Sequence, residues 1–124
     1  MRFEKLVEEK YTEIKLLEEK LDSRISPTLK GEFILLNTKG TKNILLNLGE
    51  VKYADSSGLS AILTANRLCN HAGGSLVLCS LNDHVKKLIK ISHLEQVLEI
   101  LPTQEEAREA IFMMEVEREL KQGD

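Results

Sequence analysis

Apolar and polar residues alternate along the chain in segments that predict both strands and helices. Residues 3–9 and 11–17 read as two short strands around Lys10, which predicts a hairpin. Residues 43–48 and 75–80 are almost continuously aliphatic, as expected of strands buried on both faces of a parallel sheet. Residues 97–101 read as a last strand, and we take 43–48 as the central one.

Helical spacing of apolar residues fills the intervals between these strands. Ser26 is a candidate N-cap with Pro27 in the first turn, and Gly40 ends this first helix after about residue 37. Its expected inward residues are Leu29, Phe33, Ile34 and Leu36. The later helices are predicted from residue 56 to about 71, after a cap at Asn82 or Asp83, and after a capping box of Thr103 and Glu106.

This alternation predicts an α/β fold. We expect a mostly parallel sheet of four to five strands with an N-terminal antiparallel pair, covered by about four helices. A length of 124 residues fits one domain, expected over residues 1–114. Residues 115–124 are mostly charged, and we expect them to form a solvated helix end or tail.

Composition narrows the classes of function. The 17 basic residues are interleaved with 20 acidic ones and the net charge is −3, which disfavours nucleic acid as a partner. No apolar run reaches the roughly 18 residues that cross a bilayer, and the N-terminus is not a signal peptide, so we expect a cytoplasmic protein without membrane insertion. Cys69 and Cys79 form no CxxC pair and are expected to be reduced and packed.

Sequence motifs give no support for catalysis. The three histidines lack the spacing of a metal site, and no glycine-rich nucleotide motif occurs, so we expect neither a metal nor a cofactor. Ser56 lacks the GxSxG elbow of serine hydrolases. The chain is therefore expected not to be an enzyme.

The remaining candidate site is the loop formed by Asp55, Ser56, Ser57 and Gly58, and two interpretations of it are possible. In the first, the serines only cap the following helix, because a hydroxyl accepts hydrogen bonds from free amides of the first turn. In the second, the same helix terminus tolerates an added phosphate, whose charge beside Asp55 would disrupt any contact surface built from the loop. One serine could serve as both cap and switch.

Two segments, "ILLNLGEVKYADSSGLSAIL" and "GGSLVLCSLNDHVKKLIKISHLEQVLEILPTQEEA", give the chain a family resemblance. With them the chain resembles the STAS family, specifically the bacterial anti-sigma factor antagonists. The resemblance implies the STAS fold, and a protein whose unphosphorylated form binds an anti-sigma factor that is also a serine kinase, thereby releasing a sigma factor. It also implies a phosphatase of the PP2C type that reverses the modification, and we favour a monomer.

Matching the motif residue by residue assigns expected roles. The phosphoacceptor of the family corresponds to Ser56, within the switch loop Asp55–Gly58. Asp22 in "EKLDS", together with Leu59 and Leu63, is expected to contact the partner. Glu19 and His93 replace residues of the family pattern at positions that favour unusual backbone angles.

Two further functions stay open on the sequence. A STAS scaffold or accessory subunit of a membrane transport complex would use the loop without phosphorylation of Ser56. A small-ligand sensor or hydrolase would use Ser56 as a nucleophile, but no paired base accompanies it.

Overall fold

The computed structural model describes residues 1–122 and contains a five-stranded sheet with the strand order β1-β2-β4-β6-β7. The β1–β2 pair is antiparallel and the other three pairs are parallel, which confirms the predicted hairpin and the central position of the aliphatic strand 43–48. The strands are β1 (Phe3–Val7), β2 (Thr12–Leu16), β4 (Ile44–Asn47), β6 (Leu76–Cys79) and β7 (Glu99–Leu101).

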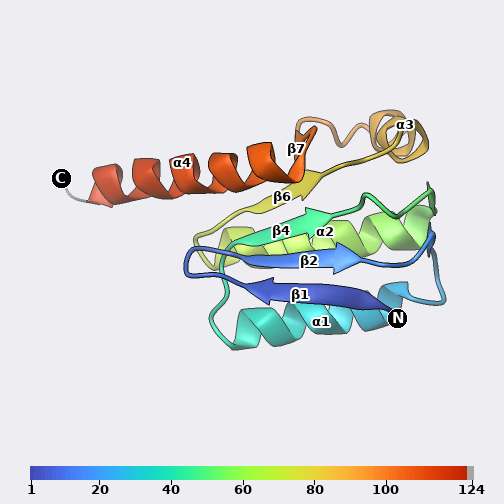
Figure 1. Cartoon of the computed structure of the whole chain (residues 1–124), viewed down its shortest axis with the longest axis horizontal. Helices are drawn as coiled ribbons and strands as arrows, with labels where there is room; N and C mark the ends of the chain where they lie inside the picture. Colours follow the sequence, from blue (N-terminus) through green and yellow to red (C-terminus); the bar gives the residue numbers. More distant parts are fainter. Residues whose placement is uncertain (123–124) are drawn as a thin grey trace.

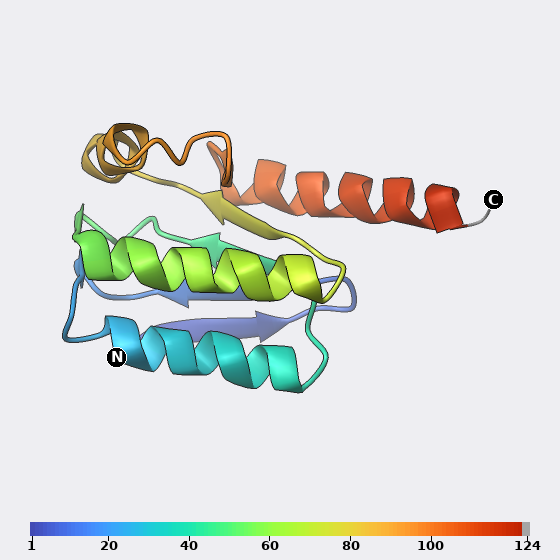
Figure 2. The same cartoon turned by 180° about the vertical axis from the view of Figure 1, so that it is seen from behind.

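Four helices cover the two faces of this sheet. They are α1 (Ser26–Thr38), α2 (Ser56–His71), α3 (Asp83–Ile91) and α4 (Gln104–Gln122). Helices α1 and α2 lie side by side on one face, and α4 packs against β6, β7 and β4 on the other (Figure 1, Figure 2). Two strands of two residues each, β3 (Lys20–Leu21) and β5 (Tyr53–Ala54), form a small parallel pair directly before α1 and α2.

The apolar core is divided by the sheet. The larger part lies between the sheet and α1, α2 and α3, where Phe33 and Ile62 are fully buried. The smaller part lies under α4 and includes Leu45 and Val77. Strands β4 and β6 contribute to both parts, which explains why their sequences are almost continuously aliphatic.

Both cysteines are free and buried, as predicted. Burial raises the pKa of the Cys69 thiol to about 11 and also raises the pKa of Cys79. Both thiols are therefore protonated and unreactive at neutral pH.

Two details of α1 differ from the prediction. The N-cap position is held by Ile25, which offers no side-chain cap, and Ser26 is instead the first helical residue. Its hydroxyl donates to the backbone oxygen of Asp22 at 2.7 Å. Ile34 is exposed rather than inward, because Leu29, Phe33 and Leu36 already occupy the buried face.

The predicted boundary at residue 114 falls within a helix, and the residues after it are not all solvated as expected. Helix α4 continues without a break to Gln122, and Glu115 is only 6% exposed. Glu115 and the half-buried Arg118 therefore belong to the packed structure, whereas the last turns of α4 extend past the sheet (Figure 1). Residues 123–124 of the expected tail lie outside the described residues.

Within residues 1–122, none of the helices has an apolar stretch long enough to cross a membrane.

Candidate functional site

Asp55 begins helix α2 as its N-cap. Its backbone is extended, and its Oδ1 accepts hydrogen bonds from the amides of Ser57 at 2.9 Å and Gly58 at 3.1 Å. The Ser57 hydroxyl also donates to Oδ1, at 2.6 Å. The expectation that a serine caps this helix is thus wrong: a carboxylate does so, since its charge also interacts favourably with the positive end of the helix.

The cap keeps Asp55 ionised. The hydrogen bond from the Ser57 hydroxyl, followed by that from the Gly58 amide, lowers the pKa of the Asp55 carboxyl below its ordinary value. The nearby charge of Asp22 acts in the opposite direction but is a smaller influence. A full negative charge therefore stands at the start of α2 at neutral pH.

The two serines of the loop differ in accessibility. Ser57 is half-buried and its hydroxyl is engaged with Asp55. Ser56 is exposed, and its side chain makes no hydrogen bond within the part of the chain that the structure describes. Ser56 is therefore the serine of the loop whose hydroxyl is exposed and takes no part in the cap.

A second contact of Ser57 connects α2 to α1. Its Oγ lies 3.2 Å from the Oγ of Ser26, which is buried and donates to the Asp22 carbonyl. Each hydroxyl has one proton, and the two shorter hydrogen bonds, to Asp55 and to Asp22, use both. The two oxygens therefore approach each other without a hydrogen bond between them, and each is oriented by its own acceptor at the start of its helix.

Gly58 is required by the close approach of strand β3. A Cβ atom at this position would overlap the backbone oxygen of Leu21 and would lie 2.7 Å from its Cγ. Leu21 also accepts a hydrogen bond from the Asp55 amide at 3.2 Å. The segment before α1 is thereby packed directly beneath the start of α2.

Comparison with known proteins identifies this arrangement. The sequence profile described as "STAS domain" matches residues 7–107. The chain belongs to the STAS domain family. The fold described above is accordingly the STAS fold, with its mostly parallel sheet and antiparallel N-terminal pair.

Curated relatives of this STAS chain include anti-sigma factor antagonists. The "Anti-sigma-B factor antagonist" of Staphylococcus aureus is 26% identical over 100 residues, which cover 81% of this chain and 92% of the relative. BtrV of Bordetella bronchiseptica is 29% identical over 90 residues, which cover 73% of this chain and 78% of BtrV.

Solved STAS structures with the same fold come from more than one kind of protein. The unphosphorylated anti-sigma factor antagonist SpoIIAA aligns over 92% of this chain and 98% of its own, with a TM-score of 0.70 and 20% identity. A sulfate transporter family protein from Wolinella succinogenes aligns over 88% and 90%, with a TM-score of 0.76 and 15% identity. At these identities the two likenesses concern the fold alone.

Asp22 lies close to the loop Asp55–Gly58, and its carboxylate is already paired with Arg24. Arg24 donates to both of its carboxylate oxygens, at 2.9 Å from Nη2 to Oδ2, and these hydrogen bonds lower the pKa of Asp22. The backbone carbonyl of Asp22 also accepts a hydrogen bond from the Ser26 hydroxyl. Asp22 is thus a neighbour of the loop whose charge is partly balanced by an exposed arginine.

The two leucines expected on the partner-facing surface, Leu59 and Leu63, differ in exposure. Leu59 is 7% exposed and belongs to the core, so its predicted place on that surface is wrong. Its side chain joins the larger core cluster, which also contains Leu21 of β3. Leu63, one turn later, is half-buried and keeps an accessible edge.

An exposed aromatic pair beside the loop was missed in the sequence. The ring of Tyr53, in β5, stacks on the imidazole of His84 with centroids 5.1 Å apart and an interplanar angle of 28°. The side-chain amide of Asn82 donates to the Lys52 carbonyl and brings the two elements together. The two-residue strand β5 is too short for a periodic pattern, so the sequence contained little signal for this pair.

The departures from the STAS pattern have different outcomes. His93 has a φ of 59°, in the left-handed region, as expected where the third helix ends. Glu19 does not have a positive φ, and the expectation of an unusual backbone angle there is wrong.

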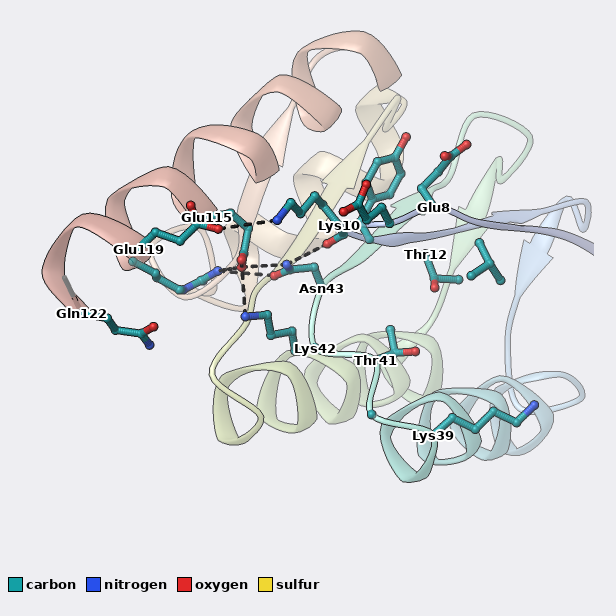
Figure 3. Close-up of a pocket in the computed structure, with 15 residues that line it drawn as sticks. Glu8, Lys10, Thr12, Lys39, Thr41, Lys42, Asn43, Glu115, Glu119 and Gln122 are labelled. Atoms are coloured by element: carbon teal, nitrogen blue, oxygen red, sulfur yellow. Dashed lines mark hydrogen bonds and ion pairs between the residues drawn. The ribbon is translucent and has the colours of Figure 1, made fainter.

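A separate polar cluster lies at the other end of the parallel strands of this STAS domain. Figure 3 shows Glu115 reaching from α4 to Asn43 and Lys42, at 2.9 Å and 3.3 Å. Arg118 donates to the same carboxylate at 2.6 Å and also to Ser75. A hollow of about 460 Å³ adjoins the cluster, and five of the charged side chains that line it form ion pairs: Lys10 with Glu119, and Lys42 and Arg118 with Glu115.

Proposed function

We propose that this chain is a phosphorylation-switched anti-sigma factor antagonist. In its unmodified form it binds an anti-sigma factor that is also a serine kinase, and a sigma factor is thereby released. Phosphorylation of Ser56 blocks the binding. The observation that carries the proposal is the accessibility of the Ser56 hydroxyl, which stands next to a capping carboxylate without being part of the cap.

The relatives support this role. Curated relatives of S. aureus and Paenibacillus polymyxa are named anti-sigma-B and anti-sigma F factor antagonists. SpoIIAA has been solved in an unphosphorylated and a phosphorylated form, and both share the fold of this chain with a TM-score of 0.70. The STAS fold therefore accommodates both states in that protein.

Electrostatics explains how one phosphate could act as a switch here. A phosphoserine adds about 1.5 to 2 negative charges at neutral pH. At Ser56 these would stand beside the ionised Asp55 and near Asp22. The helix N-terminus tolerates the charge, so the fold persists, whereas a partner surface matched to the unmodified loop meets strong like-charge repulsion.

The surface offered to the anti-sigma factor would centre on Ser56. The half-buried Leu63 and the exposed Tyr53 flank it and supply apolar contact area, while Leu59 supports the loop from within the core. Aromatic and aliphatic contacts near the centre of an interface commonly carry most of its binding energy.

In this proposal the chain is a substrate and a binding partner rather than an enzyme. The kinase supplies the phosphate, and a PP2C-type phosphatase in the cytoplasm removes it. The chain needs no metal or cofactor of its own for this cycle, and it acts as a monomer.

Binding to a purified anti-sigma factor kinase of the source organism tests the proposal. Calorimetric titration without ATP should give a Kd for Ser56→Ala within about threefold of wild type, because a methyl group adds no charge. Ser56→Asp should weaken binding at least about tenfold by like-charge repulsion. Asn70→Asp, which adds the same charge to an exposed site near the far end of α2, should leave the Kd nearly unchanged.

Two results would count against the proposal. If Ser56→Asp binds as tightly as wild type, charge at the loop does not control binding. If wild type and Ser56→Ala both fail to bind any anti-sigma factor kinase of that organism, the role itself is wrong, and an accessory role in a membrane transport complex becomes the better explanation of the STAS fold.

A further inference from the structure

Helix α4 presents a second apolar face in addition to the one that packs on the sheet. Ala107 and Ile111 are buried against β4 and β6. On the opposite side of the helix, four large apolar side chains are between 43% and 68% exposed. We call this set the α4 stripe, and it consists of Phe112, Met113, Val116 and Leu120.

The spacing of the α4 stripe makes it continuous. Phe112, Val116 and Leu120 follow one another at intervals of four residues, and Met113 precedes Val116 by three, so the four side chains lie along one face over two turns of the helix. Exposed apolar side chains scattered singly need no explanation, but a contiguous row usually marks an interaction site.

The α4 stripe is held in place by contacts at its base. The ring of Phe112 meets Tyr11 edge to face, with centroids 6.3 Å apart. On the inward side, Glu115 is fastened to Asn43 and Lys42 (Figure 3). These contacts fix α4 to the sheet beside the stripe. Because the helix is already ordered, a partner that binds the stripe would lose less conformational entropy.

Acidic residues surround the α4 stripe. Glu109 precedes it on the same face, and Glu117 and Glu119 lie at its edges, all of them exposed. Glu119 forms an ion pair with Lys10 at 3.5 Å, and the exposed Arg108 lies one turn before Phe112, so Glu109 and Glu117 are the acidic residues that stay available. Arg118, in contrast, is turned inward and occupied by Glu115 and Ser75. The charge at the edges of the stripe is thus predominantly negative.

We propose that the α4 stripe is a docking site for a basic amphipathic helix of another protein. Apolar residues of that helix at positions i, i+3, i+4 and i+7 would lie along the stripe, and its flanking lysines or arginines would pair with the glutamates. A second copy of this chain would instead bring acidic edges against acidic edges, and an anionic membrane surface would be repelled.

This site is remote from the loop at Ser56. Helix α2 begins at one end of the molecule, whereas the last turns of α4 extend past the opposite end (Figure 1, Figure 2). The site goes beyond the proposed switch and is independent of it, so it can be present whether or not Ser56 is phosphorylated.

Two synthetic helical peptides test the proposal. Both carry leucines at i, i+3, i+4 and i+7, and they differ only in having lysines or glutamates at the flanks. By fluorescence anisotropy at low salt, the full chain should bind the lysine peptide, and the Kd for the glutamate peptide should be at least about tenfold higher. Raising the salt to about 0.5 M should weaken the lysine peptide severalfold.

Substitutions locate the binding. The triple variant Met113→Ser, Val116→Ser, Leu120→Ser should raise the Kd for the lysine peptide at least about tenfold. Ile91→Ser removes a side chain that is 65% exposed on α3 and should leave the Kd unchanged. All of these positions are exposed, so the fold is expected to persist, and circular dichroism checks that it does.

Charge reversal provides a second, independent readout. The double variant Glu109→Lys, Glu117→Lys should bind the glutamate peptide more tightly than the lysine peptide. Ser56→Asp should alter neither affinity, which separates failure of this inference from failure of the proposed switch.

Three outcomes would overturn the proposal. The first is equal binding of both peptides, or binding that the triple variant leaves intact. The second is self-association in sedimentation experiments that the triple variant abolishes, which would assign the stripe to a second copy. The third is binding of the chain to vesicles of anionic phospholipid through the stripe.

Discussion

Polar clusters occupy both ends of the parallel strands, and they differ in what they leave accessible. At the amino end, the carboxylate of Glu115 is shared by Asn43, Lys42 and Arg118. At the carboxyl end, Asp55 satisfies the amides of α2, and the Ser56 hydroxyl beside it is left exposed. A cluster that pairs all of its members stabilises the fold, whereas one that leaves an accessible hydroxyl offers a site for modification.

Removing Glu115 should cause the largest loss of stability. Glu115→Ala leaves the buried Asn43 amide and the Arg118 guanidinium without their shared acceptor, at an expected cost of about 2 to 3 kcal/mol in the free energy of unfolding. Urea denaturation at neutral pH measures it. Glu117→Ala, on the exposed side of the same helix, should change the value by less than about 0.5 kcal/mol. Equal effects of the two variants would show that the cluster contributes nothing.

The contribution of Glu115 to stability should depend on pH. Burial opposes ionisation of Glu115, but hydrogen bonds from Asn43 and Arg118 and the contact with Lys42 outweigh it and lower the pKa of the carboxyl. Its stabilising contribution is therefore complete above the ordinary carboxyl pKa and is lost as the pH falls through the lower folded value. The difference between wild type and Glu115→Ala should shrink in acid denaturation series below about pH 4.

Two glycine substitutions test whether Gly58 is required by the packing of Leu21, with Gly31 in α1 as the control. Gly58→Ala places a methyl group against Leu21 and should destabilise the protein by about 2 kcal/mol. Gly31→Ala, within α1, meets nothing within 4 Å and should stabilise it by about 0.5 to 1 kcal/mol. Thermal unfolding of both variants checks the contrast, and a Gly58→Ala protein as stable as wild type would contradict the packing described for β3.

The smallest expected changes in stability distinguish the capping residue Asp55 from its neighbour Ser56. Asp55→Ala removes the acceptor for the Ser57 and Gly58 amides and should cost about 1 kcal/mol. Ser56→Ala removes a hydroxyl that makes no hydrogen bond within residues 1–122 and should change stability by less than about 0.5 kcal/mol. If the order of these two losses in urea denaturation were reversed, Ser56 would be the structural residue and Asp55 would not.

The features that the sequence predicted well are those with strong local signals. Aliphatic runs predicted β4 and β6. Of the two residues predicted as the possible cap of α3, Asn82 and Asp83, it is Asn82 whose side chain accepts a hydrogen bond from the Val85 amide at 2.9 Å. Resemblance to a family, rather than any physical pattern, singled out Ser56.

The errors have a common cause in tertiary contacts. Leu59 is buried in a core cluster that Leu21 also joins, and Leu21 belongs to β3, a strand of two residues that has no periodicity of its own. Glu115 lies in a charged run and reads as solvated, although it follows Ile111 by four residues and so continues the buried face of α4. Its partners Asn43 and Lys42 lie just before β4, far away in the sequence, and the sequence alone does not bring them together with Glu115.

The central claim is that Ser56 is a modified residue rather than a structural one. It is tested most directly by intact-mass spectrometry and peptide mapping of the protein from its native cells, before and after phosphatase treatment. The account predicts one addition of about 80 Da, the mass of a phosphate group, located on Ser56 and removed by the phosphatase. A phosphate on Ser57 instead, or a Ser56 that stays unmodified under all growth conditions, would contradict it.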